Sequence, residues 1–174
     1  MKSGGARAIT TAGHCGNSQS YAGNPLAYNN DEVRTTSDDE QSHSKSGAIY
    51  RNRIYVGGIP GYRDITSKKT RSQQNIGDFV CKYGKATGWG CGWIVSKTAP
   101  PCGGVGAPAN TAIRVDSDPN GAGYDLSAPG DSGGPFVVGN TALGGMSCQL
   151  DFDAIYVAVD YIESGLGATI LTSP

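Results

Sequence analysis

A serine and a histidine that lie far apart in the chain occupy short sequences that could form a nucleophilic site. Ser132 lies in Gly-Asp-Ser-Gly-Gly-Pro at residues 130–135, and His14 lies in Thr-Ala-Gly-His-Cys at residues 11–15. A serine hydroxyl is a weak nucleophile until an imidazole accepts its proton, and the imidazole needs a carboxylate that fixes its tautomer. The glycines allow the N–H groups of Gly130 and Ser132 to point at one place, where they would stabilise the oxyanion of an acyl-transfer intermediate.

The serine motif has two other interpretations. It could be a simple turn, because 27 of the 174 residues are glycine. It also fits the Gly-x-Ser-x-Gly elbow of the α/β-hydrolases, which would make the protein an esterase or lipase. That elbow leads into a helix, whereas residues 135–138 indicate a strand, and the hydrolase order of serine, acid and histidine is reversed here. The histidine follows a run at residues 8–12 that predicts a strand ending in a glycine turn, and this context favours a catalytic base.

The two motifs, in this order, resemble those of the chymotrypsin-like (trypsin-fold) serine proteases. A third stretch, Val-Cys-Lys-Tyr-Gly-Lys-Ala-Thr-Gly-Trp-Gly-Cys-Gly at residues 80–92, is similar to a segment of their small secreted bacterial branch, the streptogrisin and α-lytic protease type. The resemblance runs from about Ala8 to the C-terminus. It implies an all-β fold, a double β-barrel in a single domain over residues 1–174. It also implies a serine endopeptidase in which Ser132 is the nucleophile and His14 acts first as base and then as acid.

The acid that orients the histidine must come from between the two motifs. The candidates are Asp31, Asp38, Asp39, Asp64, Asp78, Asp116, Asp118 and Asp125. We favour Asp39, because Asp-Glu-Gln-Ser-His at residues 39–43 is similar to the Asp-x-Gln-aromatic-His segment of some bacterial relatives, and Asp38 is its nearest substitute. A rival alignment places Ser46 at the acid position of an Asp-x-Ala-apolar pattern, in which case the triad lacks its acid.

The resemblance also assigns roles to side chains around the nucleophile. In the bacterial branch the acid beside the serine pairs with a basic residue that follows the first hairpin cysteine. The resemblance therefore implies an ion pair between Asp131 and Lys82. A buried carboxylate needs such a partner, because an unpaired charge away from water is costly.

The primary substrate pocket is expected beside the oxyanion glycine. Its walls would come from the residues just before that glycine and from the later strand, namely Leu126, Ser127, Ser147 and Gln149. Leu126 occupies the position where trypsin-like relatives carry a selecting aspartate. An apolar base disfavours a charged side chain, so we predict cleavage after large apolar or aromatic residues. A shift of one residue would bring Asp125 into the pocket and select Arg or Lys instead.

Five cysteines favour an oxidising compartment, and an odd number leaves one unpaired. The resemblance implies one disulfide between Cys81 and Cys91 across a hairpin and a second between Cys102 and Cys148. Cys15 is then unpaired, because its partner in the family lies on a preceding strand. A zinc site is a competing use of spaced Cys and His, but the chain has no close Cys-x-x-Cys pair. We expect no metal and no cofactor.

Composition and charge narrow the classes of partner. The net charge is −1 and the sequence pI is about 6.1. These values give no basic field for nucleic acid or for an anionic membrane, and no apolar run has transmembrane length. We therefore expect a polypeptide substrate, no nucleic acid or membrane partner, and a monomer.

The composition, rich in Gly, Ser, Thr, Tyr and Val and poor in Leu and Met, favours many short strands joined by turns. We expect a short C-terminal helix over residues 159–165 and loops over residues 17–45 and 98–110. The predicted strands cover residues 48–56, 78–82, 92–96, 111–115, 135–138, 143–147 and 154–159.

The start of the chain is shorter than the family pattern. Only 13 residues precede His14, whereas the relatives carry about two more strands there, and residues 1–5 lack the apolar segment of a signal peptide. We expect an N-terminally truncated protease with an incomplete N-terminal barrel. A secreted location is implied by the family and the cysteines.

Two functions follow from these motifs. The leading hypothesis is a serine endopeptidase that uses His14, Asp39 and Ser132. The alternative is a non-catalytic protease-fold module that binds peptides or proteins through the same cleft. The enzyme is favoured by the histidine, the serine and the oxyanion glycines. The module is favoured by the rival alignment of the acid and by the short segment before His14.

Overall fold

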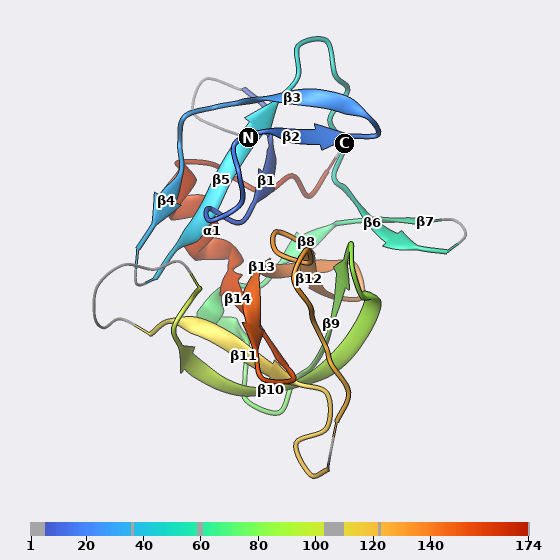
Figure 1. The fold of residues 1–174 in the computed structure, drawn as a ribbon, viewed down its shortest axis with the longest axis vertical. Helices are drawn as coiled ribbons and strands as arrows, with labels where there is room; N and C mark the ends of the chain where they lie inside the picture. The colour runs from blue at the N-terminus through green and yellow to red at the C-terminus, as the bar shows by residue number, and fades with distance from the viewer. Residues whose placement is uncertain (1–5, 36, 59–60, 103–109, 122, 174) are drawn as a thin grey trace.

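Residues 79–158 contain a closed, antiparallel, six-stranded β-barrel (Figure 1). The computed structural model describes residues 6–35, 37–58, 61–102, 110–121 and 123–173. Around the barrel the strands follow the order β12 (Pro135–Val138), β9 (Phe79–Gly84), β10 (Gly88–Ala99), β11 (Ala112–Asp116), β14 (Asp153–Ala158) and β13 (Thr141–Leu150), and β13 pairs with β12 to close the ring. The short strand β8 (Ser67–Lys68) adds to β13 in parallel.

The barrel encloses the main hydrophobic core. Strand β9 alternates, so that Val80, Lys82 and Gly84 are buried, while all six residues of β14 are buried. The ring of Phe136 stacks on Tyr156 at a centroid distance of 4.2 Å. The other buried members of this core are Val80, Ile94, Ile113, Val115, Leu126, Leu143, Met146, Ala154 and Ala158. The barrel therefore provides a rigid frame for the loops between its strands.

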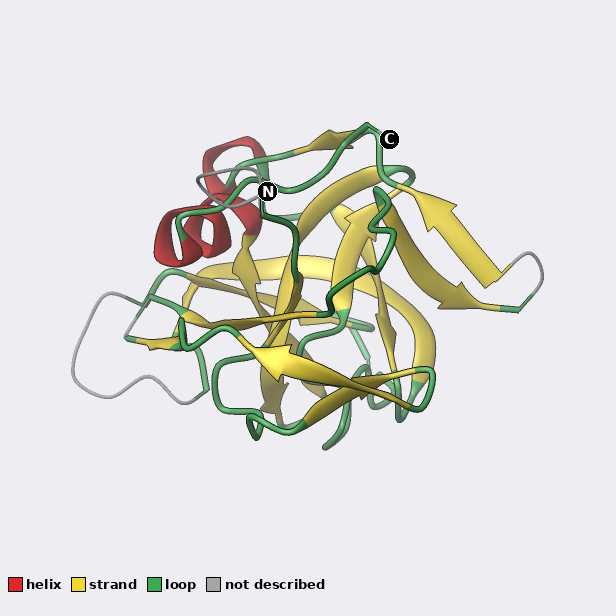
Figure 2. Cartoon of the chain, turned by 90° about the horizontal axis from the view of Figure 1, so that it is seen from above, coloured by secondary structure: helices red, strands yellow, loops and turns green. Residues whose placement is uncertain are grey.

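The N-terminal part forms a smaller, open sheet in the order β1 (Ile9–Thr11), β5 (Asp39–Ser44), β3 (Asn24–Tyr28) and β2 (Gln19–Tyr21), with β4 (Val33–Arg34) also paired to β5. Between the two sheets, β6 (Arg53–Gly57) and β7 (Gly61–Asp64) form a hairpin that projects from the molecule (Figure 2). A 3₁₀ turn, η1 (Arg71–Gln73), precedes the barrel. The predicted all-β fold with an incomplete N-terminal barrel is confirmed.

One short helix, α1 (Val159–Leu166), follows β14 directly and is the helix that the sequence predicts. It ends where Gly167 adopts a left-handed conformation, with φ of 56°, and the Gly167 N–H donates to the Ser164 carbonyl. Its buried face, Ile162 and Leu166, packs with Val33 of β4. The helix therefore connects the two sheets. No helix in the described part of the chain is long and apolar enough to span a membrane.

Three of the predicted boundaries are wrong. Residues 17–45 are not a loop, since they contain β2, β3, β4 and β5. Strand β6 begins at Arg53, so residues 48–52 of the predicted strand are not in a strand. Strand β10 extends to Ala99, into the loop predicted over residues 98–110, of which residues 103–109 lie outside the described residues.

Candidate active site

His14 lies in the turn that follows β1. The Cys15 N–H donates to the Ala12 carbonyl at 3.1 Å and closes this turn. The preceding Gly13 packs closely against the neighbouring strands, because a Cβ at this position would be 2.8 Å from the Val33 carbonyl oxygen. Glycine is therefore required where β1 passes the start of β5, and this close approach brings His14 beside Asp39.

Asp39 is the first residue of β5 and is buried. Its Oδ1 accepts the His14 backbone N–H at 2.9 Å, and its Oδ2 lies 2.8 Å from His14 Nδ1. This side-chain hydrogen bond to Asp39 raises the pKa of His14 above its ordinary value, against the lowering effect of burial. The bond also fixes the tautomer in which Nε2 can accept a proton.

The structure separates the other two acid positions from His14. Asp38 Oδ2 accepts the Thr35 hydroxyl at 2.9 Å, and Ser46 is exposed in the turn after β5. Of these three positions, Asp39 alone makes a hydrogen bond to His14 in the part of the chain that the structure describes.

Ser132 lies on the loop before β12, on the other side of the histidine. Its Oγ is 3.0 Å from His14 Nε2 and 3.0 Å from the Ser147 carbonyl oxygen, so the hydroxyl proton has two acceptors. Gly133 has φ of 85°, and a Cβ on it would collide with Thr11 of β1. A Cβ on Gly134 would collide with the Tyr83 carbonyl oxygen. Both glycines of the motif are therefore required for this loop to pack between the two sheets.

The backbone beside Ser132 has two free donors. Gly130 has φ of 102°, a conformation that glycine adopts without strain. In the described structure neither the Gly130 N–H nor the Ser132 N–H donates to a protein acceptor, whereas the N–H of Asp131 between them donates to the Ala128 carbonyl at 3.1 Å. These two N–H groups are thus available to a negatively charged oxygen near Ser132.

Asp131 and Lys82 meet inside the barrel. Lys82 Nζ lies 3.2 Å from Asp131 Oδ2, and both side chains are almost completely buried. The carboxylate also accepts the N–H groups of Ala86 at 2.6 Å and Thr87 at 3.1 Å, and the Thr87 hydroxyl at 2.5 Å. Although burial acts to raise its pKa, the hydrogen bonds from Thr87 and Ala86 and the charge of Lys82 hold the pKa of Asp131 below its ordinary value. The loop that carries Ser132 is therefore anchored to β9 and the turn after it.

Ser147 contacts Asp39 through a β-bulge. The pairing of β13 with β14 shifts between Met146 and Cys148, which leaves Ser147 as the additional residue. Its hydroxyl donates to Asp39 Oδ2 at 2.5 Å and accepts the Cys102 N–H at 2.9 Å. We expected Ser147 in the substrate pocket, and no sequence signal marks the bulge that turns its hydroxyl to Asp39.

The other expected pocket residues lie in three different environments. Leu126 is buried in the barrel core, and Asp125 beside it is exposed. Ser127 is buried, and its hydroxyl donates to the Asp153 carbonyl at 3.2 Å. Gln149 is half-buried and donates to the Asp151 carbonyl at 2.6 Å.

Both predicted disulfides are formed, Cys81–Cys91 across the β9–β10 hairpin and Cys102–Cys148, while Cys15 is a free cysteine. The first joins directly paired residues, and the second ties the segment after β10 to β13 beside Ser147. Among the described residues, no group of three or more His, Cys, Asp or Glu side chains could hold a metal ion.

Comparisons with known proteins identify the fold. No family model matches the chain. Streptogrisin-C of Streptomyces griseus is 25% identical over 175 residues, covering 95% of this chain and 35% of that protein, so the chain spans about a third of the curated relative's length.

Solved structures give TM-scores of 0.71 for Nocardiopsis protease (NAPase; 24% identity, 95% of this chain and 85% of that one), 0.75 for a glutamic-acid-specific serine protease (23%, 98% and 89%) and 0.72 for Thermobifida fusca protease A (22%, 99% and 88%). The chain therefore has the chymotrypsin-like double-barrel fold, and in sequence and fold it resembles the bacterial serine proteases.

Proposed function

We propose that this chain is a serine endopeptidase that hydrolyses peptide bonds through an acyl-enzyme. The observation that carries the proposal is the hydrogen-bonded series from Asp39 Oδ2 through His14 Nδ1 and Nε2 to Ser132 Oγ, with distances of 2.8 and 3.0 Å. In a serine triad, nucleophilic acyl transfer uses these three groups in this order. The similarity to streptogrisin-C supports the same function.

The geometry supports the following sequence of steps. Ser132 Oγ attacks the scissile carbonyl carbon while its proton moves to His14 Nε2, and the Asp39 carboxylate stabilises the resulting imidazolium. The carbonyl oxygen becomes an oxyanion that accepts the N–H groups of Gly130 and Ser132. His14 then donates its proton to the leaving amine as the C–N bond breaks, which leaves the acyl-enzyme. Water, deprotonated by His14, attacks the ester carbon, and the proton returns to Ser132 as the acid product leaves.

A cleft beside Ser132 fits a polypeptide. It has a volume of about 800 Å³, and Ile9, Tyr50, Tyr62 and Gly130 are among the residues that line it. The cleft contains apolar and aromatic side chains, among them Ile9, Tyr50 and Tyr62, and these support the preference for a large apolar or aromatic residue before the scissile bond. We further propose that the enzyme is a monomer that needs no cofactor and acts in a secreted, oxidising setting, where disulfides persist.

The test combines labelling with hydrolysis. The folded protein is treated with a fluorophosphonate probe, and chromogenic peptides that differ only in the residue before the scissile bond are assayed in parallel. We expect labelling at Ser132 and hydrolysis of peptides with Phe, Tyr or Leu at that position. Ser132→Ala should abolish both, whereas Ser46→Ala, a serine exposed in the turn after β5, should retain both.

The outcomes separate the alternatives. Absence of labelling in the folded wild-type protein would overturn the proposed enzymatic function and favour a peptide-binding module. Labelling at Ser132 together with faster hydrolysis of peptides that have Arg or Lys before the scissile bond would support the protease function and contradict the apolar preference.

A further inference from the structure

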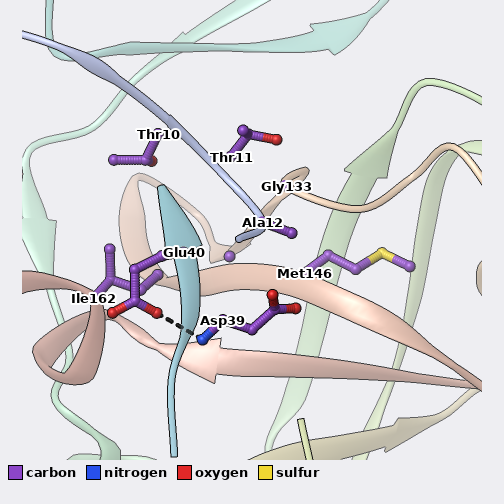
Figure 3. Close-up of a pocket in the computed structure, with 9 residues that line it drawn as sticks. Thr10, Thr11, Ala12, Asp39, Glu40, Gly133, Met146 and Ile162 are labelled. Carbon is purple, nitrogen blue, oxygen red and sulfur yellow. Dashed lines mark hydrogen bonds between the residues drawn. The ribbon is translucent and has the colours of Figure 1, made fainter. Parts of the chain in front are cut away.

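A second carboxyl group lies directly behind Asp39. Glu40 follows it on β5 and is 2% exposed. Its Oε2 accepts the Asp39 backbone N–H at 2.8 Å, the contact drawn as a dashed line in Figure 3. A Cβ on Gly165 of α1 would collide with Glu40 Oε1. The carboxyl group is therefore packed between the backbone of the triad acid and the helix that connects the two sheets.

In the described structure no cation pairs with the Glu40 carboxyl group. Within the described structure its Oε1 has no hydrogen-bond partner and its carboxyl makes no ion pair. Asp39 on the same strand and Asp38 just before that strand both add negative charge near Glu40. Two of the elements that pack against Glu40 carry charged groups. Arg34 of β4 is paired with Glu32. On α1, Asp160 accepts the Arg71 backbone N–H and Glu163 pairs with Lys68. Tyr161 is the other titratable side chain on this helix, and β1 has none.

Water has little access to this carboxyl group. The adjoining pocket, lined by Thr10, Ala12, Gly133 and Ile162 among others (Figure 3), has a volume of about 10 Å³. One water molecule needs about that much space, so an ionised Glu40 would remain almost unhydrated. Burial, with the negative charge of Asp38, raises the pKa of Glu40 to about 8.

We propose that Glu40 is a positioning residue for Asp39, which holds the triad in register only while it is an uncharged carboxylic acid. This inference rests on the proposed function. The neutral group accepts the Asp39 N–H without repelling the Asp39 carboxylate. Loss of its proton places a second negative charge behind Asp39, and this charge can reach water only if β5 moves away from α1. That movement would withdraw Asp39 from His14.

The expected signature is a loss of activity at alkaline pH that Glu40 controls. In the wild type, kcat/KM should fall about tenfold per pH unit above the pKa of Glu40. Glu40→Gln keeps a carbonyl oxygen for the Asp39 N–H but cannot ionise, so it should retain activity at neutral pH and lose this alkaline decline. Glu32→Gln, which removes an exposed carboxylate just before the neighbouring strand β4, is the matched control and should behave as the wild type. An identical alkaline decline in wild type and Glu40→Gln would overturn the inference.

A spectroscopic measurement on the wild-type protein tests the inference even if the variants fail to fold. The chain has three glutamates, Glu32, Glu40 and Glu163, so ¹³C-labelled glutamate gives three carboxyl signals in the wild-type protein. We expect one of them to titrate near pH 8, together with loss of the low-field Nδ1–H signal of His14. Titration of all three signals below pH 6 would overturn the inference.

The two proposals fail in different ways. If the protein neither labels nor hydrolyses at any pH, the proposed function fails. The His14 Nδ1–H signal then still decides whether Glu40 holds Asp39 in place, because that signal depends on the hydrogen bond and not on turnover.

Discussion

Replacement of Lys82 by methionine tests how the nucleophile loop is held. The substitution keeps most of the side-chain length and leaves Asp131 as a buried carboxylate without its cation. At a separation of 3.2 Å the attraction is about 5 kcal/mol for an effective dielectric constant near 20. Removal of one partner of a buried pair costs about 3–5 kcal/mol. Because Asp131 would keep its hydrogen bonds from Ala86 and Thr87, we expect the lower end, about 3 kcal/mol.

Denaturant unfolding of the wild type, Lys82→Met, Asp131→Asn and the double variant measures this value as a mutant cycle. Turnover should fall as well, because Asp131 adjoins Ser132 and a displacement of about 1 Å can reduce the rate by about a hundredfold. Arg53→Met, which breaks the exposed pair with Asp64, is the control and should have little effect. A Lys82→Met protein with wild-type stability and turnover would refute the reasoning.

Two further predictions concern the triad and the second disulfide. Asp39→Asn should reduce turnover by about 10⁴-fold. It should also shift the acidic limb of the pH–rate profile to lower pH, because the hydrogen bond to the carboxylate that raises the pKa of His14 is lost. An acidic limb at the wild-type pH would contradict the assignment of Asp39. Replacement of Cys102 and Cys148 by serine opens a loop with a sequence separation of 46 and should reduce the free energy of unfolding by about 4 kcal/mol. A loss below about 1 kcal/mol in urea unfolding would contradict this loop-closure argument.

The sequence was sufficient where local pattern and chemistry agree. Strands β9, β12 and β14 contain short apolar runs, and these strands and the helix α1 were each predicted close to their observed places. The contact of His14 with Ser132 could not come from a local pattern, because 118 positions separate the two residues. It was predicted from the chemistry of the two residues. A nucleophile of this type implies a base, and the motif around each residue identified the candidates.

The buried polar strand β5 could not be predicted from periodicity. Its first five residues are polar or charged, yet all are buried, and partners distant in sequence satisfy much of their hydrogen bonding. The Gln41 amide donates to the Cys15 carbonyl at 2.7 Å, and Ser42 N–H donates to Asp31 at 2.9 Å. A pattern without apolar alternation indicates a loop when such partners are unknown. The role of Glu40 was hidden for the same reason.

The bulge in β13 limits which changes of chain length the protein can accept. Met146 and Ser147 are consecutive and both buried, one toward the barrel core and the other toward Asp39. Deletion of one residue here would make the pairing of β13 with β14 regular, which a barrel tolerates well, but it would turn the serine hydroxyl away from the carboxylate. The exposed turn between β2 and β3 carries no such constraint. During divergence, loop lengths can therefore change, while the length of β13 stays fixed because Ser147 must contact Asp39 and not because the barrel requires it.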